Sequence, residues 1–203
     1  LVVDVQNDFC PPTAQADGQM RGGGLAVLGG HDIVPLIKQL SERFDNIVLT
    51  QDWHPAGHVS FASSHPGKAP FETIDLPYGT QVLWPDHCVQ GTYGAELHPA
   101  LAIPRAQLIV RKGYHPHTDS YSAFLEADRA TPTGLDGYLA ARGIQHVYCV
   151  GLALDFCVAW TALDARRYGL KATVVEDACR AIDAPGRAGG TLAEARLALR
   201  AAG

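Results

Sequence analysis

Several features that mark large classes of protein are missing from this sequence of 203 residues. No apolar run reaches the roughly 18 residues that a membrane-spanning helix needs, so we expect no membrane partner. Basic residues are not in excess, since 16 Lys and Arg stand against 21 Asp and Glu, and this argues against nucleic acid as a partner. The five cysteines include no C-x-x-C pair, which argues against a disulfide framework.

Two further absences narrow the functional classes. No G-x-G-x-x-G motif follows the first apolar run, which argues against a dinucleotide-binding module. No signal peptide opens the chain, and together with the unpaired cysteines this predicts a cytoplasmic protein. What is present, 47% hydrophobic and 18% charged residues, is typical of a globular chain with one sizeable core. We therefore expect a single domain over residues 1–203.

Short apolar runs alternate with amphipathic segments along most of the chain. Near-continuous runs of the kind expected for strands buried on both faces occur at residues 1–5, 46–50, 107–110, 146–150 and 171–175. Apolar residues at helical spacing predict helices over residues 32–44, 135–142, 155–168 and 189–201. This alternation predicts an α/β fold with a doubly wound, mostly parallel sheet and helices on both faces. Residues 51–104 break the rhythm, and we expect there an irregular insertion that carries function.

The insertion begins with an Asp-x-His pair, Asp52 and His54, directly after the second expected strand. In an extended segment, residues two apart point the same way, so both side chains can contact one ion. His87, near the end of the insertion, can complete the set. Two imidazoles and one carboxylate suit Zn²⁺, Fe²⁺ or Mn²⁺. His58 stays open between a fourth ligand and a supporting residue, and the competing interpretation is a polar loop with ordinary hydrogen-bonded histidines.

A cysteine follows the fourth expected strand, where the chain turns into a helix. Asp155 can cap that helix, and Cys157 then lies in its first turn, where the helix dipole favours a thiolate. Backbone amides of the same turn, including those of Ala153 and Cys157, can form an oxyanion hole. Asp4, ending the first strand, can accept the thiol proton, and Lys112, ending the third, can hold the charge. The alternative is that Cys157 is a small buried packing residue.

Taken in order, six segments resemble motifs of the nicotinamidase/pyrazinamidase family of isochorismatase-like cysteine hydrolases. They are residues 4–9, 51–55, 84–88, 112–113, 119–124 and 151–158. The resemblance covers essentially the whole chain, and the Asp-Trp-His and Trp-Pro-x-His-Cys segments are the most particular to nicotinamidases. The chain opens inside its first strand and stops about where the family's last strand is expected. We therefore expect it to be trimmed at both ends.

The resemblance implies a role for each matched residue and an isochorismatase-like hydrolase fold. The implied catalytic triad is Asp4, Lys112 and Cys157. The implied metal ligands, carried by the insertion, are Asp52, His54 and His87. In some members a further histidine near the position of His58 also binds the metal, which keeps its role open.

The resemblance also implies how the substrate is held. Phe9 and Trp84 match the aromatic residues that flank the substrate ring. Ala153 matches the position whose amide helps to bind the oxyanion, and in the family the peptide before it is cis. Tyr121 lies in a matching segment, but the resemblance implies no definite role for its side chain.

The implied reaction is hydrolysis of the carboxamide of nicotinamide, and of pyrazinamide, to the acid and ammonia through a cysteine thioester. A divalent metal, zinc in the first place, would hold the ring nitrogen. One alternative is another hydrolase of the superfamily, acting on a vinyl ether such as isochorismate or on an N-carbamoyl compound. A second is a metallohydrolase in which a metal-bound water attacks and Cys157 is structural. The sequence does not indicate an oligomeric state.

Overall fold

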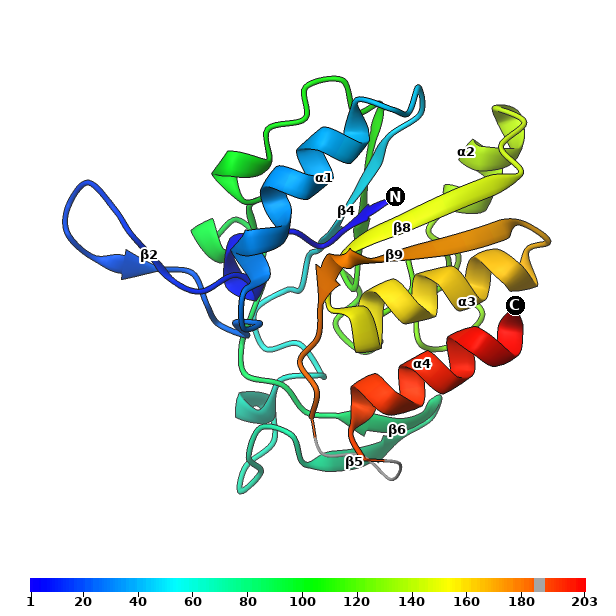
Figure 1. Ribbon diagram of the computed structural model, residues 1–203. Coiled ribbons are helices and arrows are strands. Elements are labelled where there is room, and N and C mark those ends of the chain that lie inside the picture. Colours follow the sequence, from blue (N-terminus) through cyan, green and yellow to red (C-terminus); the bar gives the residue numbers. More distant parts are fainter. Residues whose placement is uncertain (185–188) are drawn as a thin grey trace.

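The computed structural model of the protein describes residues 1–184 and 189–203. Its centre is a sheet of five parallel strands in the order β7-β4-β1-β8-β9 (Figure 1). These strands are β1 (Val2–Val3), β4 (Val48–Asp52), β7 (Leu108–Lys112), β8 (His146–Leu152) and β9 (Lys171–Arg180). Each apolar run identified in the sequence is therefore a strand of this sheet, and the prediction of a doubly wound α/β fold is confirmed.

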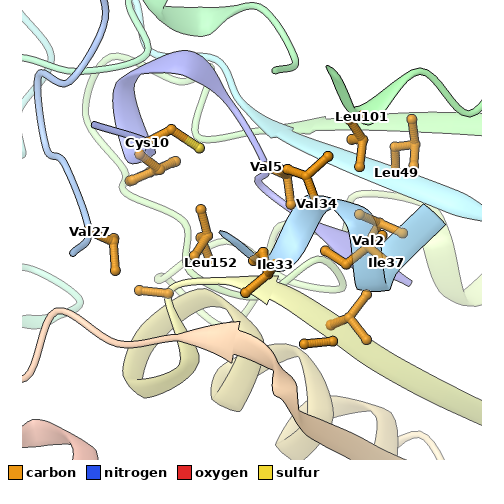
Figure 2. Close-up of a cluster of buried hydrophobic side chains, with 14 of the residues drawn as sticks. Val2, Val5, Cys10, Val27, Ile33, Val34, Ile37, Leu49, Leu101 and Leu152 are labelled. Carbon is orange, nitrogen blue, oxygen red and sulfur yellow. The ribbon is translucent and has the colours of Figure 1, made fainter. Parts of the chain in front are cut away.

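Successive side chains of the strands enter two hydrophobic layers, one on each face of the sheet. The helices are α1 (Val34–Ser41), α2 (Leu135–Ala141), α3 (Ala159–Arg167) and α4 (Thr191–Ala202). Val2 packs into one cluster with Ile37 of α1 (Figure 2), whereas the next residue, Val3, packs into a second cluster with Leu139 of α2 and Ala162 of α3. α4 packs against α3 on that second face. Helices therefore cover both faces, as strands without polar alternation predict.

Two of the segments predicted as α-helices begin with a turn of another helix type. The segment predicted as a helix over residues 32–44 opens with a 3-10 turn (Gly30–Ile33), and α1 ends at Ser41. The segment predicted over residues 155–168 opens with one π-helical turn (Leu154–Val158) before α3. Such turns are frequent at functional sites, and this one carries Cys157. Within the described ranges, no helix is long and apolar enough to cross a membrane.

The insertion over residues 51–104 contains more regular structure than the sequence predicts. β5 (Thr73–Leu76) and β6 (Gly79–Val82) form an antiparallel hairpin. A second hairpin lies outside the insertion, near the N-terminus. It is formed by β2 (Thr13–Ala14) and β3 (Met20–Arg21) and projects from the body of the molecule (Figure 1). Both were missed because their strands are only two or four residues long, too short for a polar–apolar alternation such as that of Thr73–Leu76 to be recognised.

The carboxyl ends of the parallel strands meet at one edge of the sheet. Asp52, ending β4, is in register with Lys112, ending β7, and Asp4 follows β1 directly. Gly151, on β8, lies opposite Val3 with a φ of 119°, and a Cβ there would lie 2.1 Å from the Val3 carbonyl oxygen. Only glycine allows β1 and β8 to approach so closely. The reactive side chains that follow each strand are thereby drawn to the same edge.

Candidate active site

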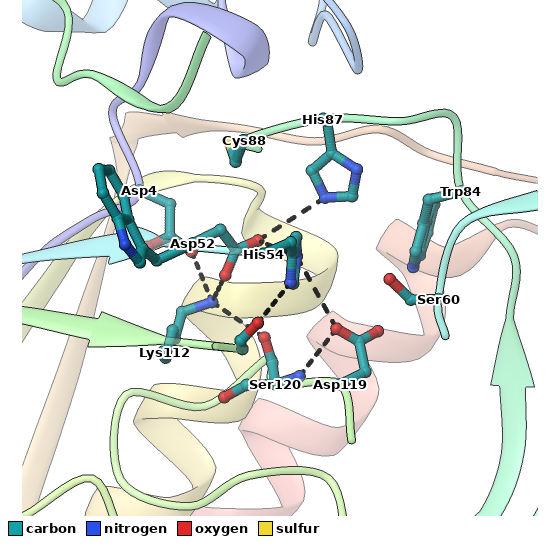
Figure 3. Close-up of polar contacts among 12 residues, drawn as sticks. Asp4, Asp52, His54, Ser60, Trp84, His87, Cys88, Lys112, Asp119 and Ser120 are labelled. Atoms are coloured by element: carbon teal, nitrogen blue, oxygen red, sulfur yellow. Dashed lines mark hydrogen bonds and ion pairs between the residues drawn. The ribbon is translucent and has the colours of Figure 1, made fainter. Parts of the chain in front are cut away.

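Three buried charged side chains meet where β1, β4 and β7 end (Figure 3). Nζ of Lys112 lies 2.8 Å from Oδ2 of Asp4 and forms an ion pair with Oδ1 of Asp52. It also donates a hydrogen bond of 3.0 Å to the carbonyl oxygen of Ser120. An ammonium between two carboxylates offsets part of the cost of removing each charge from water. Lys112 therefore joins Asp4 to Asp52, which the sequence had assigned to separate tasks.

Burial and the charges of neighbouring groups shift the pKa values of Asp4, Asp52 and Lys112. Burial alone would lower the pKa of Lys112, but Asp4 and Asp52 outweigh it and raise that pKa well above its usual value. Burial raises the pKa of Asp4, with Lys112 opposing the rise and the charge of Asp52 adding to it. Burial would also raise the pKa of Asp52, but Lys112 outweighs it and holds that pKa well below its usual value. Asp4 is therefore the carboxylate better suited to accept a proton.

Cys157 lies beside this cluster, with Sγ 3.5 Å from Nζ of Lys112. The position at a helix start favours a thiolate, whereas burial of Cys157 favours the thiol. Burial raises the pKa of Cys157 well above its usual value, and Lys112 lowers it only in part, so the group is a thiol. The expected cap is wrong, because the turn is π-helical with Ala153 as its N-cap, and Asp155 accepts hydrogen bonds from elsewhere. A resting thiol needs a proton acceptor nearby. Carboxylate oxygens of Asp4 and Asp52 both lie within 4.8 Å of Sγ, and the raised pKa of Asp4 makes it the better acceptor of the two.

Asp52 and His54 point toward one place, as their spacing predicts, and His87 joins them from the insertion (Figure 3). Oδ2 of Asp52 lies 3.6 Å from Nε2 of His54 and 3.8 Å from Nε2 of His87. Nδ1 of His54 lies 2.8 Å from the carbonyl oxygen of Gly113, and Nδ1 of His87 lies 2.8 Å from that of Pro85. Donation to these carbonyls leaves each Nε2 as an acceptor, which is the form that binds a metal. The three residues therefore fit a divalent metal ion, with their ligand atoms within 4.8 Å of one another.

The loop after β7 is shaped around His54. Gly113 has a φ of 65°, and a Cβ at this position would lie 2.5 Å from Cε1 of His54. Its amide faces both carboxylate oxygens of the buried Glu126, each at 3.3 Å. The Gly113 peptide is thus held on one side by Glu126 and presents its carbonyl to the histidine on the other.

His58 adjoins the metal-binding set but has both ring nitrogens engaged elsewhere. Its ring stacks on that of His54, with centroids 4.3 Å apart and 26° between the planes. Nδ1 lies 2.7 Å from the hydroxyl of Ser60, and Nε2 lies 2.9 Å and 3.2 Å from the carbonyl oxygens of His115 and Thr118. Burial and the neighbouring His54 lower the pKa of His58 to about 4, so the ring is neutral. His54, His58 and Asp119 also bring ligand atoms within 4.8 Å of one another, but the hydrogen bonds of both His58 nitrogens favour the supporting role of the two left open by the sequence.

A cavity adjoins Cys157 and the metal-binding set. Phe9, Trp84 and Ala153, the residues predicted to contact substrate, all line it together with Cys157. Its remaining lining residues are Leu25, Asp52, His87, Asp119, Tyr121, Phe156 and Ile182. The peptide between Leu152 and Ala153 is cis, as the resemblance implies. The indole N–H of Trp84 donates to the hydroxyl of Tyr121 at 3.1 Å, which gives Tyr121 a place in the cavity wall.

Sequence reasoning missed several residues of this site. Asp119 is buried, accepts a hydrogen bond from Gln81 at 2.7 Å and lies 4.0 Å from Nε2 of His54. Asp119 is the first residue of the motif segment 119–124. An acidic residue within a matched motif was a signal that could have been used. Leu25 and Ile182 offered no such signal. An apolar residue in a loop is recognised as part of a cavity only when the chain is folded.

Comparison with known proteins agrees with this geometry. The family model described as Isochorismatase domain matches residues 1–196. A nicotinamidase of Acinetobacter baylyi is 63% identical over 186 residues, which cover 92% of this chain and 82% of that protein. The solved structure of a nicotinamidase/pyrazinamidase of Acinetobacter baumanii matches with a TM-score of 0.91 and 58% identity, covering 99% of this chain and 90% of that one. The pyrazinamidase of Pyrococcus horikoshii in complex with zinc matches with a TM-score of 0.71 and 31% identity, covering 100% and 93%.

The parallel sheet, the buried Asp–Lys–Cys cluster and the adjoining Asp–His–His set define a site of the cysteine-hydrolase class. The chain belongs to the isochorismatase family, and within it to the nicotinamidases. The family predicted from six short segments of sequence is thereby confirmed.

Proposed function

We propose that this enzyme hydrolyses the carboxamide of nicotinamide to nicotinate and ammonia through a thioester on Cys157. The observation that carries the proposal is one cavity lined both by Cys157, which lies beside Lys112 and Asp4, and by Asp52 and His87 of the metal-binding set. A substrate with a carboxamide on a nitrogen-containing ring can contact both sets of residues at once. Its carboxamide would face Cys157, and its ring nitrogen would face the ion held by the metal-binding set. The relatives named nicotinamidase support the same substrate.

In the first half-reaction, Asp4 takes the proton of the Cys157 thiol, and the ammonium of Lys112 balances the charge on sulfur. The sulfur bonds to the carboxamide carbon. The carbon–nitrogen bond then breaks, and Asp4 passes its proton to the leaving nitrogen, which departs as ammonia. A raised pKa suits Asp4 to this work, because the same carboxyl has to accept a proton and then give it up.

In the second half-reaction, a water molecule attacks the thioester carbon while Asp4 takes one of its protons. The carbon–sulfur bond breaks, and Asp4 returns its proton to the sulfur of Cys157. The acid leaves and gives its remaining proton to solvent, which yields nicotinate. The backbone amides of Ala153 and Cys157 would stabilise the oxyanion in both halves. The position of Ala153 in the cavity wall beside Cys157 supports this assignment.

We assign a divalent metal ion to Asp52, His54 and His87, with zinc in the first place and Fe²⁺ or Mn²⁺ as alternatives. The mixed donor set supports this assignment, as does the zinc of the Pyrococcus horikoshii relative. When bound, such an ion supplies a Lewis-acidic contact for the ring nitrogen. Phe9 and Trp84 would flank the ring and hold its carboxamide toward Cys157.

The same contacts suit related substrates. Pyrazinamide carries the carboxamide on a ring with a second nitrogen, so we expect the enzyme to accept it. We assign the enzyme to the cytoplasm, a reducing compartment in keeping with its five free cysteines, and treat residues 1–203 as one domain.

Ammonia release from nicotinamide, measured alongside the zinc content per chain, tests the proposal. Cys157→Ala should keep the zinc content of the wild type and lose turnover. Substantial residual turnover would refute the thiol mechanism. A wild-type enzyme that is fully loaded with zinc and releases no ammonia would refute the substrate.

Alkylation by iodoacetamide separates this mechanism from one in which a metal-bound water attacks and the cysteine only packs. If Cys157 is the nucleophile, alkylation should abolish turnover, and nicotinate should slow both alkylation and inactivation. Full activity in a quantitatively alkylated enzyme would favour the metal-bound water.

A further inference from the structure

The carboxylate of Asp155 joins the turn that carries Cys157 to a distant part of the chain. Its Oδ1 accepts a hydrogen bond of 3.1 Å from the amide of Ile182. Its Oδ2 accepts one of 2.8 Å from the amide of Asp183 and one of 2.5 Å from the hydroxyl of Thr191. Asp155 is only 6% exposed, and its three hydrogen bonds are partly buried. Among the described residues, the side chain thus receives three donors, two from the segment after β9 and one from the start of α4.

The segment after β9 is tied to α4 by further bonds. The amide of Thr191 donates to the carbonyl oxygen of Ala184 at 2.9 Å, and the amide of Leu192 donates to Oδ1 of Asp183 at 3.3 Å. A Cβ at Gly190 would lie 2.4 Å from that same Asp183 oxygen, so the two stretches are in close contact. Residues 182–184 are therefore held between the Cys157 turn on one side and α4 on the other.

Ile182 is the residue of this segment that reaches the substrate cavity. Its amide is bound by Asp155, and its side chain lines the cavity that also contains Cys157. The side chain packs at the margin of the cluster that includes Phe9 and Trp84. An apolar wall residue held by its own backbone has little freedom to move aside for a larger ligand.

We infer that Asp155 and Thr191 form a clasp that fixes Ile182 as a wall of the substrate cavity, and that Ile182 determines which ring substituents the enzyme accepts. This inference rests on the proposed nicotinamidase function. Neither Asp155 nor Thr191 lines the cavity, so both are positioning residues. Ile182 is a specificity residue that acts by its volume.

Removing the volume of Ile182 tests its role. Kinetics with nicotinamide and with its four ring-methylated derivatives should be compared between the wild type and Ile182→Ala. A pocket discriminates one methyl group by roughly tenfold or more, so the ratio of kcat/KM for at least one methylated derivative over nicotinamide should rise about tenfold in the variant. Equal changes for every substrate would show that Ile182 does not select substituents and would overturn the inference.

The clasp is tested at Thr191, because a substitution of Asp155 would disturb the turn that carries Cys157. Thr191→Val keeps the side-chain shape and removes the hydroxyl donor. We expect KM for nicotinamide to rise about three- to tenfold, as loss of one hydrogen bond to a carboxylate allows, with kcat nearly unchanged. Thr191→Ser should restore the wild-type KM. An unchanged KM in the valine variant, or a serine variant that behaves like valine, would overturn the clasp.

A matched control is available at the other end of β9. The hydroxyl of Thr173 also forms a side-chain hydrogen bond, 2.9 Å from Nε2 of His146, but far from the cavity. Thr173→Val should leave KM and substrate preference as in the wild type. If it raises KM as much as Thr191→Val does, the effect belongs to general loosening of the fold, and the clasp is refuted.

Binding of nicotinate, measured by calorimetry, distinguishes failure of this inference from failure of the proposed function. Ile182→Ala should weaken nicotinate binding while Cys157 keeps its wild-type rate of alkylation by iodoacetamide. If the wild type binds no nicotinate and releases no ammonia, the proposed function fails. If it does both and Ile182→Ala matches it throughout, only the specificity role fails.

Discussion

Thr50 on β4 holds Asp4 by two hydrogen bonds. The hydroxyl of Thr50 donates to Oδ1 of Asp4 at 2.5 Å, and the amide of Asp4 donates to the same hydroxyl oxygen at 3.1 Å. Oδ2 of Asp4 is thereby turned toward Lys112, 2.8 Å away. Thr50 therefore selects which carboxylate oxygen of Asp4 faces the lysine.

Thr50→Val should lower kcat for nicotinamide about ten- to hundredfold with little change in KM. The reason is that a hydrogen bond to a charged group contributes about 1.5–3 kcal/mol, and its loss frees the Asp4 carboxylate to rotate. Thr50→Ser keeps the hydroxyl and should retain most of the activity. Steady-state kinetics of both variants, with zinc content as a control, checks this. A serine variant as slow as the valine variant would show that the methyl group, and not the hydroxyl, matters.

Lys112→Met should destabilise the fold as well as abolish turnover. It leaves the carboxylates of Asp4 and Asp52 buried without their shared cation, and breaking a buried ion pair typically costs about 3–5 kcal/mol. Urea unfolding measures the loss. The exposed Lys171 offers a matched control, since Lys171→Met should change the free energy of unfolding by less than about 0.5 kcal/mol.

The double variant Asp4→Asn with Lys112→Met separates the charge from the packing. Neutralising Asp4 removes one of the two carboxylates left uncompensated, so the double variant should recover part of the lost stability. A double variant less stable than Lys112→Met alone would contradict the charge explanation. Neither variant should release ammonia, because each lacks part of the proposed proton-transfer set.

His54 and His58 should respond differently to the same substitution. His54→Gln removes a nitrogen that faces Asp52 and His87, so most of the bound zinc should be lost after dialysis. His58→Gln changes a ring whose nitrogens are engaged by Ser60 and by backbone carbonyls, so zinc content should stay close to that of the wild type. Elemental analysis per chain measures both. Equal zinc loss in the two variants would make His58 a ligand.

Glu126 should make folding stability depend on pH between about 4.5 and 7. Burial raises the pKa of Glu126 from 4.5 to about 7, with the Gly113 amide opposing the rise. A carboxyl whose pKa is higher in the folded state favours folding when protonated, so its contribution is fully present below pH 4.5 and is lost as the pH rises toward 7. The loss amounts to about 3 kcal/mol.

Urea unfolding at pH 4.5 and pH 8 checks this, with Glu126→Gln as the comparison. The glutamine keeps an acceptor for the Gly113 amide but does not titrate. The free energy of unfolding of the wild type should therefore fall relative to the variant by about 3 kcal/mol between the two pH values. Parallel pH dependence of the two proteins would contradict a raised Glu126 pKa.

The strands and the pairing of Asp52 with His54 were accessible from the sequence because both depend on local geometry. In a strand buried on both faces, consecutive apolar residues enter opposite cores, as Val48 and Leu49 do. Side chains two apart in an extended chain share a direction, as Asp52 and His54 do. The family resemblance then connected these segments to Asp4, Lys112 and Cys157. The hairpin β5–β6 was missed because each of its strands has only four residues and contributes no continuous apolar run.

Hydrogen bonds that orient the residues of the site could not be predicted from local sequence patterns. Thr50 meets Asp4 across 46 residues and Thr191 meets Asp155 across 36, and the register of two strands or the packing of a helix brings each pair together. No spacing in the sequence marks such a partner. All threonines have the same hydroxyl group, so only the folded structure shows which of them lies beside a carboxylate.

By itself the sequence determined the sheet, its helices and the family of the enzyme, because periodicity and short motifs are properties of neighbouring residues. Only the tertiary structure decided that Cys157 rests as a thiol, that His58 has both nitrogens engaged, and that Ile182 forms a wall of the cavity. Each of these depends on burial and on groups contributed by several segments at once. Desolvation and hydrogen bonding act through space, so the chain has to be folded before their outcome exists.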